Sequence, residues 1–165
     1  MTYFVDLSPY SYLQELVRAK TRNIGWLDQK HDFRKAVPCE ADIDILWEFC
    51  KVSIAQTRGV HPCSICKVDG PVFAQHDGQS LLLGTSEIRV FGDDDEIYSA
   101  PTLIFHYMTV HNYLPPNEFM HALRSGVAPP SEKYFGRLKA LNLEWGDTSG
   151  SGTSPQTFRL EQLPE

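Results

Sequence analysis

The sequence predicts an α+β fold, in which a small antiparallel sheet or hairpins pack with three to four helices. Apolar residues recur at helical spacing over residues 42–55 and again over residues 102–113. Between these segments, over residues 71–98, short β-prone runs alternate with Gly and Asp turn signals. A chain of 165 residues, of which 42 % are hydrophobic, is long enough for one domain with a substantial core.

The first third of the chain predicts short elements and then a long helix. Residues 2–7 alternate weakly, which predicts an edge strand, and residues 13–19 predict a short helix. Residues 23–27 are compatible with a strand or a loop, and Trp26 is expected in the core. The helix over residues 42–55 is the strongest prediction, because its apolar residues share one face and acidic residues lie at its start.

The middle of the chain predicts strands and hairpins. Residues 71–74 and 80–83 are apolar runs on either side of an Asp-Gly turn signal. Residues 87–91 alternate, and a turn of three aspartates separates them from a second β-prone pair at residues 97–98. We therefore expect residues 87–98 to form a hairpin with an acidic turn.

Three further helices are expected toward the C-terminus, over residues 102–113, 117–125 and 131–141. Together these elements predict a single α+β domain over residues 1–145. Residues 146–165 are rich in Gly, Ser and Thr, and we expect them to form a flexible or weakly structured tail.

Composition excludes several classes of protein. No apolar run is long enough for a transmembrane helix, and the start of the sequence does not resemble a secretory signal, so a cytoplasmic location without membrane association is expected. Lys and Arg number 15 and Asp and Glu number 21, which gives a formal net charge of −6. That balance disfavours nucleic acid as a direct ligand and suits a basic protein partner.

Cys63 and Cys66 form a Cys-x-x-Cys pair, which has three interpretations. It can be half of a zinc site, a redox dithiol or two unrelated cysteines. A disulfide framework is disfavoured in a reducing compartment, and no thioredoxin-like βαβ pattern surrounds the pair.

His106 and His111 supply the two further ligands that tetrahedral zinc would need. Their spacing falls within the His-x(3–5)-His range of zinc fingers. The order of a cysteine turn, a hairpin and a ligand-bearing helix predicts a zinc-knuckle-like site, with His61 as an alternative ligand. Positions five apart on an ideal helix diverge by about 140°, so we expect the helix to fray or tighten near His111.

Asp93, Asp94, Asp95 and Glu96 form the densest acidic cluster in the chain. Such a cluster can steer a basic protein toward the surface. A solvated hairpin turn explains the same residues without any partner.

Several segments resemble an uncharacterised bacterial domain family common in actinomycetes. The resemblance covers about residues 1–125 and depends on the segment 57–66, on Glu87-Ile88-Arg89-Val90, and on the segment that begins Ala100-Pro101-Thr102-Leu103-Ile104-Phe105-His106-Tyr107. Val60 departs from the pattern, which has an aromatic residue there. The resemblance implies that His61, Cys63, Cys66, His106 and His111 are used jointly. It also implies kinship with proteins of which some resemble immunity proteins of bacterial competition systems.

Three functions agree with these observations. The first is a zinc-stabilised cytosolic binding protein, in its most specific form an immunity protein that neutralises a basic toxin by stoichiometric binding. The second is a zinc-dependent hydrolase or nuclease, in which a histidine or Glu87 would act as the base. The third is a zinc module that binds nucleic acid, which the net charge disfavours. No catalytic residue is predicted, because no nucleophile–base pattern or phosphate-binding loop is recognisable.

Overall fold

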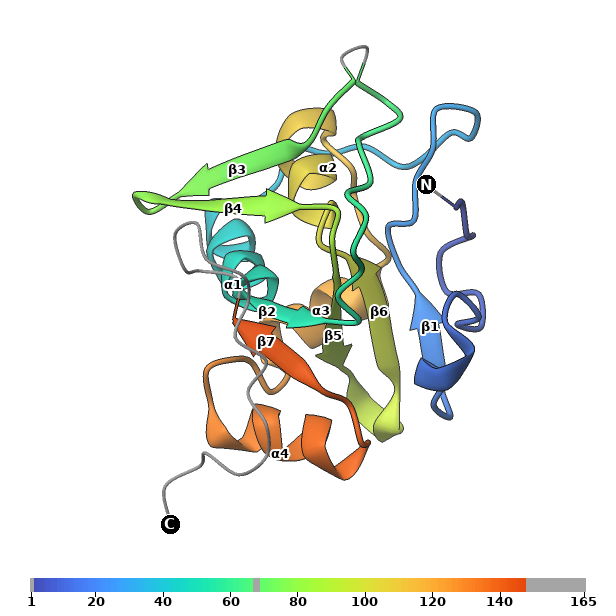
Figure 1. Cartoon of the computed structure of the whole chain (residues 1–165), viewed down its shortest axis with the longest axis vertical. Helices are drawn as coiled ribbons and strands as arrows, with labels where there is room; N and C mark the ends of the chain where they lie inside the picture. The colour runs from blue at the N-terminus through green and yellow to red at the C-terminus, as the bar shows by residue number, and fades with distance from the viewer. Residues whose placement is uncertain (1, 67–68, 148–165) are drawn as a thin grey trace.

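The computed structural model describes residues 2–66 and 69–147 and has the predicted α+β fold (Figure 1). Its larger sheet has five strands in the order β1-β6-β5-β2-β7, and its second sheet is a hairpin of β3 and β4. The strands are β1 (Thr21–Asn23), β2 (Val52–Ile54), β3 (Val72–His76), β4 (Gln79–Leu83), β5 (Glu87–Phe91), β6 (Ile97–Pro101) and β7 (Trp145–Asp147).

The β5–β6 hairpin forms the centre of the larger sheet. Its antiparallel register runs from Glu87 opposite Pro101 to Phe91 opposite Ile97, which confirms the predicted hairpin with its acidic turn. β1 joins β6 in parallel, whereas β2 and β7 extend the other side in antiparallel pairing. Every residue of β5 and β6 is buried. Both faces of this part of the sheet are therefore covered.

Four α-helices surround the sheets: α1 (Glu40–Lys51), α2 (Ile104–His111), α3 (Asn117–Ser125) and α4 (Glu132–Ala140). Helices α1 and α3 both contact β5, and α1 also contacts α2 (Figure 1). The predicted helix at residues 117–125 is confirmed, since Phe119 and Leu123 are buried on its inner face. Ser131 caps α4 as expected, because its hydroxyl accepts a hydrogen bond from the backbone N–H of Tyr134.

The N-terminal segment packs on β1 and the central hairpin without forming the predicted edge strand. The backbone N–H of Leu7 donates to Asn23, and the side chain of Tyr10 donates to Glu87. The expectation of a strand at residues 2–7 is wrong, because a turn interrupts the extended chain there. The predicted helix at residues 13–19 is reduced to a single 3-10 turn, η1 (Gln14–Leu16).

Two predicted boundaries also differ from the structure. The helix expected over residues 42–55 ends at Lys51, and Val52–Ile54 become strand β2 within the sheet. Two of these three residues are β-branched and favour a strand. Strand β7 ends at Asp147, two residues past position 145, which is the last residue of the predicted domain. The rest of the predicted tail, residues 148–165, lies outside the described residues.

Candidate metal centre

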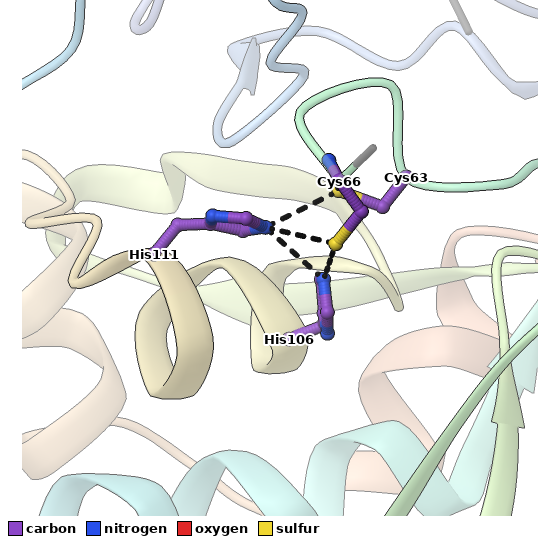
Figure 2. Close-up of side chains that lie close together, drawn as sticks. All are labelled: Cys63, Cys66, His106 and His111. Atoms are coloured by element: carbon purple, nitrogen blue, oxygen red, sulfur yellow. Dashed lines mark hydrogen bonds between the residues drawn. The ribbon is translucent and has the colours of Figure 1, made fainter. Parts of the chain in front are cut away.

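Two segments far apart in the sequence bring four ligand side chains together. Cys63 and Cys66 lie in the long connection between β2 and β3, and His106 and His111 lie on α2. Figure 2 shows the two imidazole rings and the two cysteine side chains converging. Each offers one donor atom, and the four atoms all lie within 4.8 Å of one another.

The separations between these donor atoms fit a tetrahedral ion. His106 Nε2 lies 3.2 Å from His111 Nε2 and 3.2 Å from the sulfur of Cys66. His111 Nε2 lies 3.4 Å from each of the two sulfurs. Bonds of about 2.0–2.3 Å to a tetrahedral zinc place neighbouring donor atoms roughly 3.3–3.8 Å apart. Four of the six edges of the tetrahedron therefore match a Cys₂His₂ site within a few tenths of an ångström, and the other two are no longer than 4.8 Å.

The end of α2 explains how both histidines reach one point. His111 is the last residue of the helix, and Asn112 follows it in the left-handed conformation with φ of 55°. Asparagine tolerates that conformation better than most residues. The sequence predicted that the helix would fray or tighten near His111, and in the structure the helix ends at that residue.

The histidines of this cluster have the protonation state that a metal requires. Burial is the larger cause and the neighbouring His111 the smaller one, and together they lower the pKa of His106 to about 4. Burial and, to a smaller extent, the charge of Lys35 lower the pKa of His111 as well. Both imidazoles are consequently neutral near pH 7, and a neutral imidazole has one unprotonated nitrogen whose lone pair can bind a metal.

Cys66 resists ionisation unless a cation lies close to it. Burial raises the pKa of Cys66, and the adjacent Cys63 raises it further. A bound metal reverses this effect, because it favours the thiolate strongly. The backbone N–H of Cys66 already points at the Cys63 sulfur, 3.4 Å away, where it would stabilise a thiolate.

A glycine fixes the chain that leads into the cysteines. The backbone N–H of His61 donates to the carbonyl of Gly84, at the end of β4, over 2.9 Å. Gly84 has φ of 81°, and a Cβ atom there would lie 2.3 Å from the His61 carbonyl oxygen. Only glycine permits this close approach, which anchors the connection two residues before Cys63.

His61 and Glu87, which were expected as an alternative ligand and as a possible base, lie outside the cluster. His61 Nε2 is 3.4 Å from the hydroxyl of Tyr12. The carboxylate of Glu87 is buried and accepts hydrogen bonds from Tyr10, Arg89 and Ser99. Glu87 is therefore held in a structural ion pair beneath the N-terminal segment.

The acidic cluster forms η2 (Asp93–Asp95) and Glu96, at the turn between β5 and β6. The side chains of Asp93 and Asp95 are 85 % and 90 % exposed. Each member of the cluster has a basic group close to it. The side chains of His121, Arg137 and Arg22 contact the carboxylates of Asp93, Asp95 and Glu96, respectively. The ammonium of Lys20 donates to the backbone carbonyl of Asp94. The turn is thus exposed and acidic, but partly neutralised.

A second group of three potential ligands was missed by sequence reasoning. His76 Nε2 lies 2.7 Å from Asp44 and 3.9 Å from Asp77. The ring of His76 rests against Trp47 and Phe105. Both carboxylates are exposed, and the contact between His76 and Asp44 ties the β3–β4 hairpin to α1. Asp44 and His76 are 32 positions apart in the sequence, and no sequence pattern predicts a contact over that separation.

Taken together, these features define an α+β protein with a Cys₂His₂ cluster that could hold a metal ion. The chain belongs to the family described as a domain of unknown function, DUF7919, whose model matches residues 2–124. All four clustered residues fall within that match. No curated protein and no solved structure matches the chain. Among the described residues, no helix combines the length and the apolar character that a membrane crossing requires.

Proposed function

We propose that Cys63, Cys66, His106 and His111 bind one zinc ion, and that the ion holds the connection between β2 and β3 against α2. The single observation that carries this proposal is the set of donor separations of 3.2–3.4 Å between sulfur and Nε2 atoms from two distant segments. Zinc is the metal of choice because two thiolates and two imidazoles in a tetrahedron are its typical structural ligands.

The zinc in this proposal has a structural role. Four protein ligands complete a tetrahedron, whereas a catalytic zinc keeps one position open for water or substrate. Within the described part of the chain, no carboxylate belongs to this cluster, so it contains no evident general base. The hydrolase and nuclease alternatives therefore have no specific observation in their favour.

We propose further that the zinc-stabilised domain acts by stoichiometric binding to a basic protein partner, in its most specific form as an immunity protein that neutralises a toxin. The net charge of −6 and the exposed carboxylates of Asp93 and Asp95 support a basic partner. The contact of Asp93 with His121 spans 3.4 Å and the ion pair of Asp95 with Arg137 spans 3.6 Å. Because both carboxylates are exposed, these contacts are easily exchanged for others.

Metal analysis tests the first part of the proposal. Protein purified without added metal should contain close to one zinc per chain. Reduced, folded protein that contains no metal and takes up none would contradict it. Titration against the product of a neighbouring gene tests the second part. Neutralisation only near equimolar amounts supports binding, and full rescue by trace amounts indicates an enzyme.

A further inference from the structure

A small pocket lies between the N-terminal segment, the start of the connection that follows β2 and the link between β4 and β5. Its volume is about 20 Å³, which is room for one group the size of a water molecule. Tyr12 and His61 are part-exposed and belong to its rim. Trp26, Ser86 and Glu87 are buried and belong to its floor.

Ser86 gives this pocket an unused hydrogen-bonding group. The residue is only 7 % exposed, and its hydroxyl has no hydrogen-bond partner. Its backbone carbonyl accepts hydrogen bonds from the N–H and the hydroxyl of Thr102, which fixes the residue in place. A buried hydroxyl without a partner is unfavourable, and in the wall of a pocket a ligand can satisfy it.

Glu87 adds a carboxylate oxygen with spare capacity. Its Oε2 atom accepts hydrogen bonds from Arg89 and Ser99, and its Oε1 atom accepts one from Tyr10. A carboxylate oxygen has two lone pairs, so Oε1 has room for a second donor. Glu87 lines the pocket and Arg89 does not, so the negative end of this ion pair lies nearer to the cavity. Among the described residues that line the pocket, none is Lys or Arg.

Two aromatic rings also line the pocket. The ring centroids of Tyr12 and Trp26 are 4.7 Å apart at an angle of 49°, and Phe4 contacts both rings edge-on. The Tyr12 hydroxyl lies 3.4 Å from Nε2 of His61, and the Trp26 indole N–H donates to the Ser99 carbonyl over 3.4 Å. Both rings are therefore held in position, and the faces of such rings attract cations.

We propose that this pocket takes the ammonium group of a lysine side chain that the basic protein partner presents. This inference deepens the binding function proposed above and rests on it for the kind of partner. An ammonium is a compact cation with three donors, for which the Ser86 hydroxyl and Oε1 of Glu87 are acceptors. The hydrocarbon stem of the lysine would lie along the Tyr12 ring at the rim. A guanidinium is planar and larger, so the pocket selects lysine over arginine.

The pocket is separate from the acidic turn. Glu87 lies opposite Pro101 at one end of the β5–β6 hairpin, whereas the turn of Asp93–Asp95 follows Phe91 at the other end. Changes in the pocket therefore leave the acidic turn intact, and the two surfaces are tested independently.

The first experiment uses n-butylammonium as a mimic of the lysine side chain. Titrated into the wild-type protein, it should shift the NMR signal of the Trp26 indole N–H in a saturable way. The matched probes n-butylguanidinium and n-butanol should bind about tenfold more weakly, because the first is larger and the second carries no charge. Equally tight binding of either probe, or no saturable shift with n-butylammonium, overturns the proposal.

Ser86→Ala removes a hydroxyl that has no partner to lose within the protein. We expect the dissociation constant of n-butylammonium to rise about tenfold, since a hydrogen bond to a charged group is lost, and the thermal midpoint not to fall. Ser125→Ala is the matched control, because Ser125 is exposed and lies outside the pocket. Unchanged binding in Ser86→Ala, or an equal loss in the control, overturns the proposal.

Tyr12 tests the contribution of the aromatic rings. Tyr12→Leu removes the ring face and should weaken n-butylammonium binding, whereas Tyr12→Phe keeps the ring and should bind it as the wild type does. Equal binding by the Leu and Phe variants would contradict a cation held against this ring.

Titration against the partner separates this inference from the proposed function. Ser86→Ala and Tyr12→Leu should neutralise the partner less tightly than Ser125→Ala does. If the wild type and both pocket variants neutralise it equally, the assignment of the pocket is overturned and the binding function stands. If the wild type neutralises no partner, the binding function fails, and the n-butylammonium titration then decides the pocket on its own.

Discussion

The Nε2 atoms of His106 and His111 lie 3.2 Å apart, although an ideal helix would turn residues five positions apart about 140° away from each other. The end of α2 at His111 resolves this conflict, because the chain leaves the helix at the left-handed Asn112. The Cys–His cluster therefore depends on where the helix ends as much as on the four residues themselves.

Zinc removal should destabilise the protein. An unfolded chain has no preformed site, so the free energy of zinc binding contributes to folding. Loss of a structural metal is among the few changes that cost more than about 4 kcal/mol, and about 1 kcal/mol corresponds to roughly 2–4 °C at this chain length. We expect a strong chelator to lower the thermal midpoint by roughly 10 °C or more, and added zinc to restore it. An unchanged midpoint after verified metal loss would contradict a structural role.

Cys63→Ser and Cys66→Ser should each lower both zinc content and the thermal midpoint. A serine hydroxyl is far less acidic than a thiol and replaces it poorly as a zinc ligand. Cys39→Ser is the matched control, since Cys39 is exposed and lies outside the cluster. The zinc content of this control should equal that of wild type, and its thermal midpoint should not fall, because serine is a favoured residue at this N-cap position of α1. Equal losses in all three variants would show a general sensitivity to cysteine replacement.

Gly84→Ala should destabilise the protein and weaken zinc binding together. The new Cβ would lie 2.3 Å from the His61 carbonyl oxygen, at a φ of 81° that alanine rarely adopts. We expect a loss of about 1–3 kcal/mol in chemical unfolding. Gly136→Ala is the control, because nothing lies within 4 Å of its Cβ position in α4. That change should stabilise the protein by about 0.5–1 kcal/mol.

Stability near acidic pH should respond to Asp6. Burial raises the pKa of Asp6, although Gly25, Tyr113 and Arg34 lower it. The folded state therefore holds this proton more tightly than the unfolded state does. Its contribution is full below the ordinary pKa of 3.8 and is lost as pH rises through the folded pKa. Asp6→Asn should remove this fall in stability with rising pH, as measured by chemical unfolding over a pH series. An identical pH profile in the variant would contradict the assignment.

The acidic turn should affect association with a basic partner more than it affects folding. Asp94 and Asp95 have φ of 51° and 62°, so asparagine replaces them with less backbone strain than lysine would. The triple change of Asp93, Asp94 and Asp95 to Asn should change stability by no more than about 0.5 kcal/mol. It should slow association with a basic partner, with the effect fading at high salt. An unchanged association rate would place the binding surface elsewhere.

The Cys–His cluster and most helices could be predicted because local signals mark them. Cys-x-x-Cys is a turn that presents two sulfurs, and residues 117–125 repeat apolar side chains on one helical face. The strands β1, β2 and β7 were harder to predict, because each has three residues and three residues show no alternation. The apolar residues of β2 continue the helical spacing of α1. For this reason the helix was predicted to run through β2 to residue 55.

Other parts of the site depend on tertiary packing, which leaves no spacing signal. The contact between Asp44 and His76, the second group of potential ligands, arises only when α1 and the β3–β4 hairpin pack together. His61 illustrates the opposite error. Its position two residues before Cys63 made it an alternative ligand, but the anchoring of its backbone at Gly84 leaves its ring beside Tyr12.

Strand β7 has a practical consequence for shortening the chain. It pairs with all three residues of β2 and forms one end of the larger sheet. A protein truncated after Glu144 would leave the outer edge of β2 with unpaired N–H and carbonyl groups, which invite pairing with another molecule. Aggregation, rather than simple loss of stability, is the expected result. Asp147 is therefore the earliest safe end point for a shortened protein.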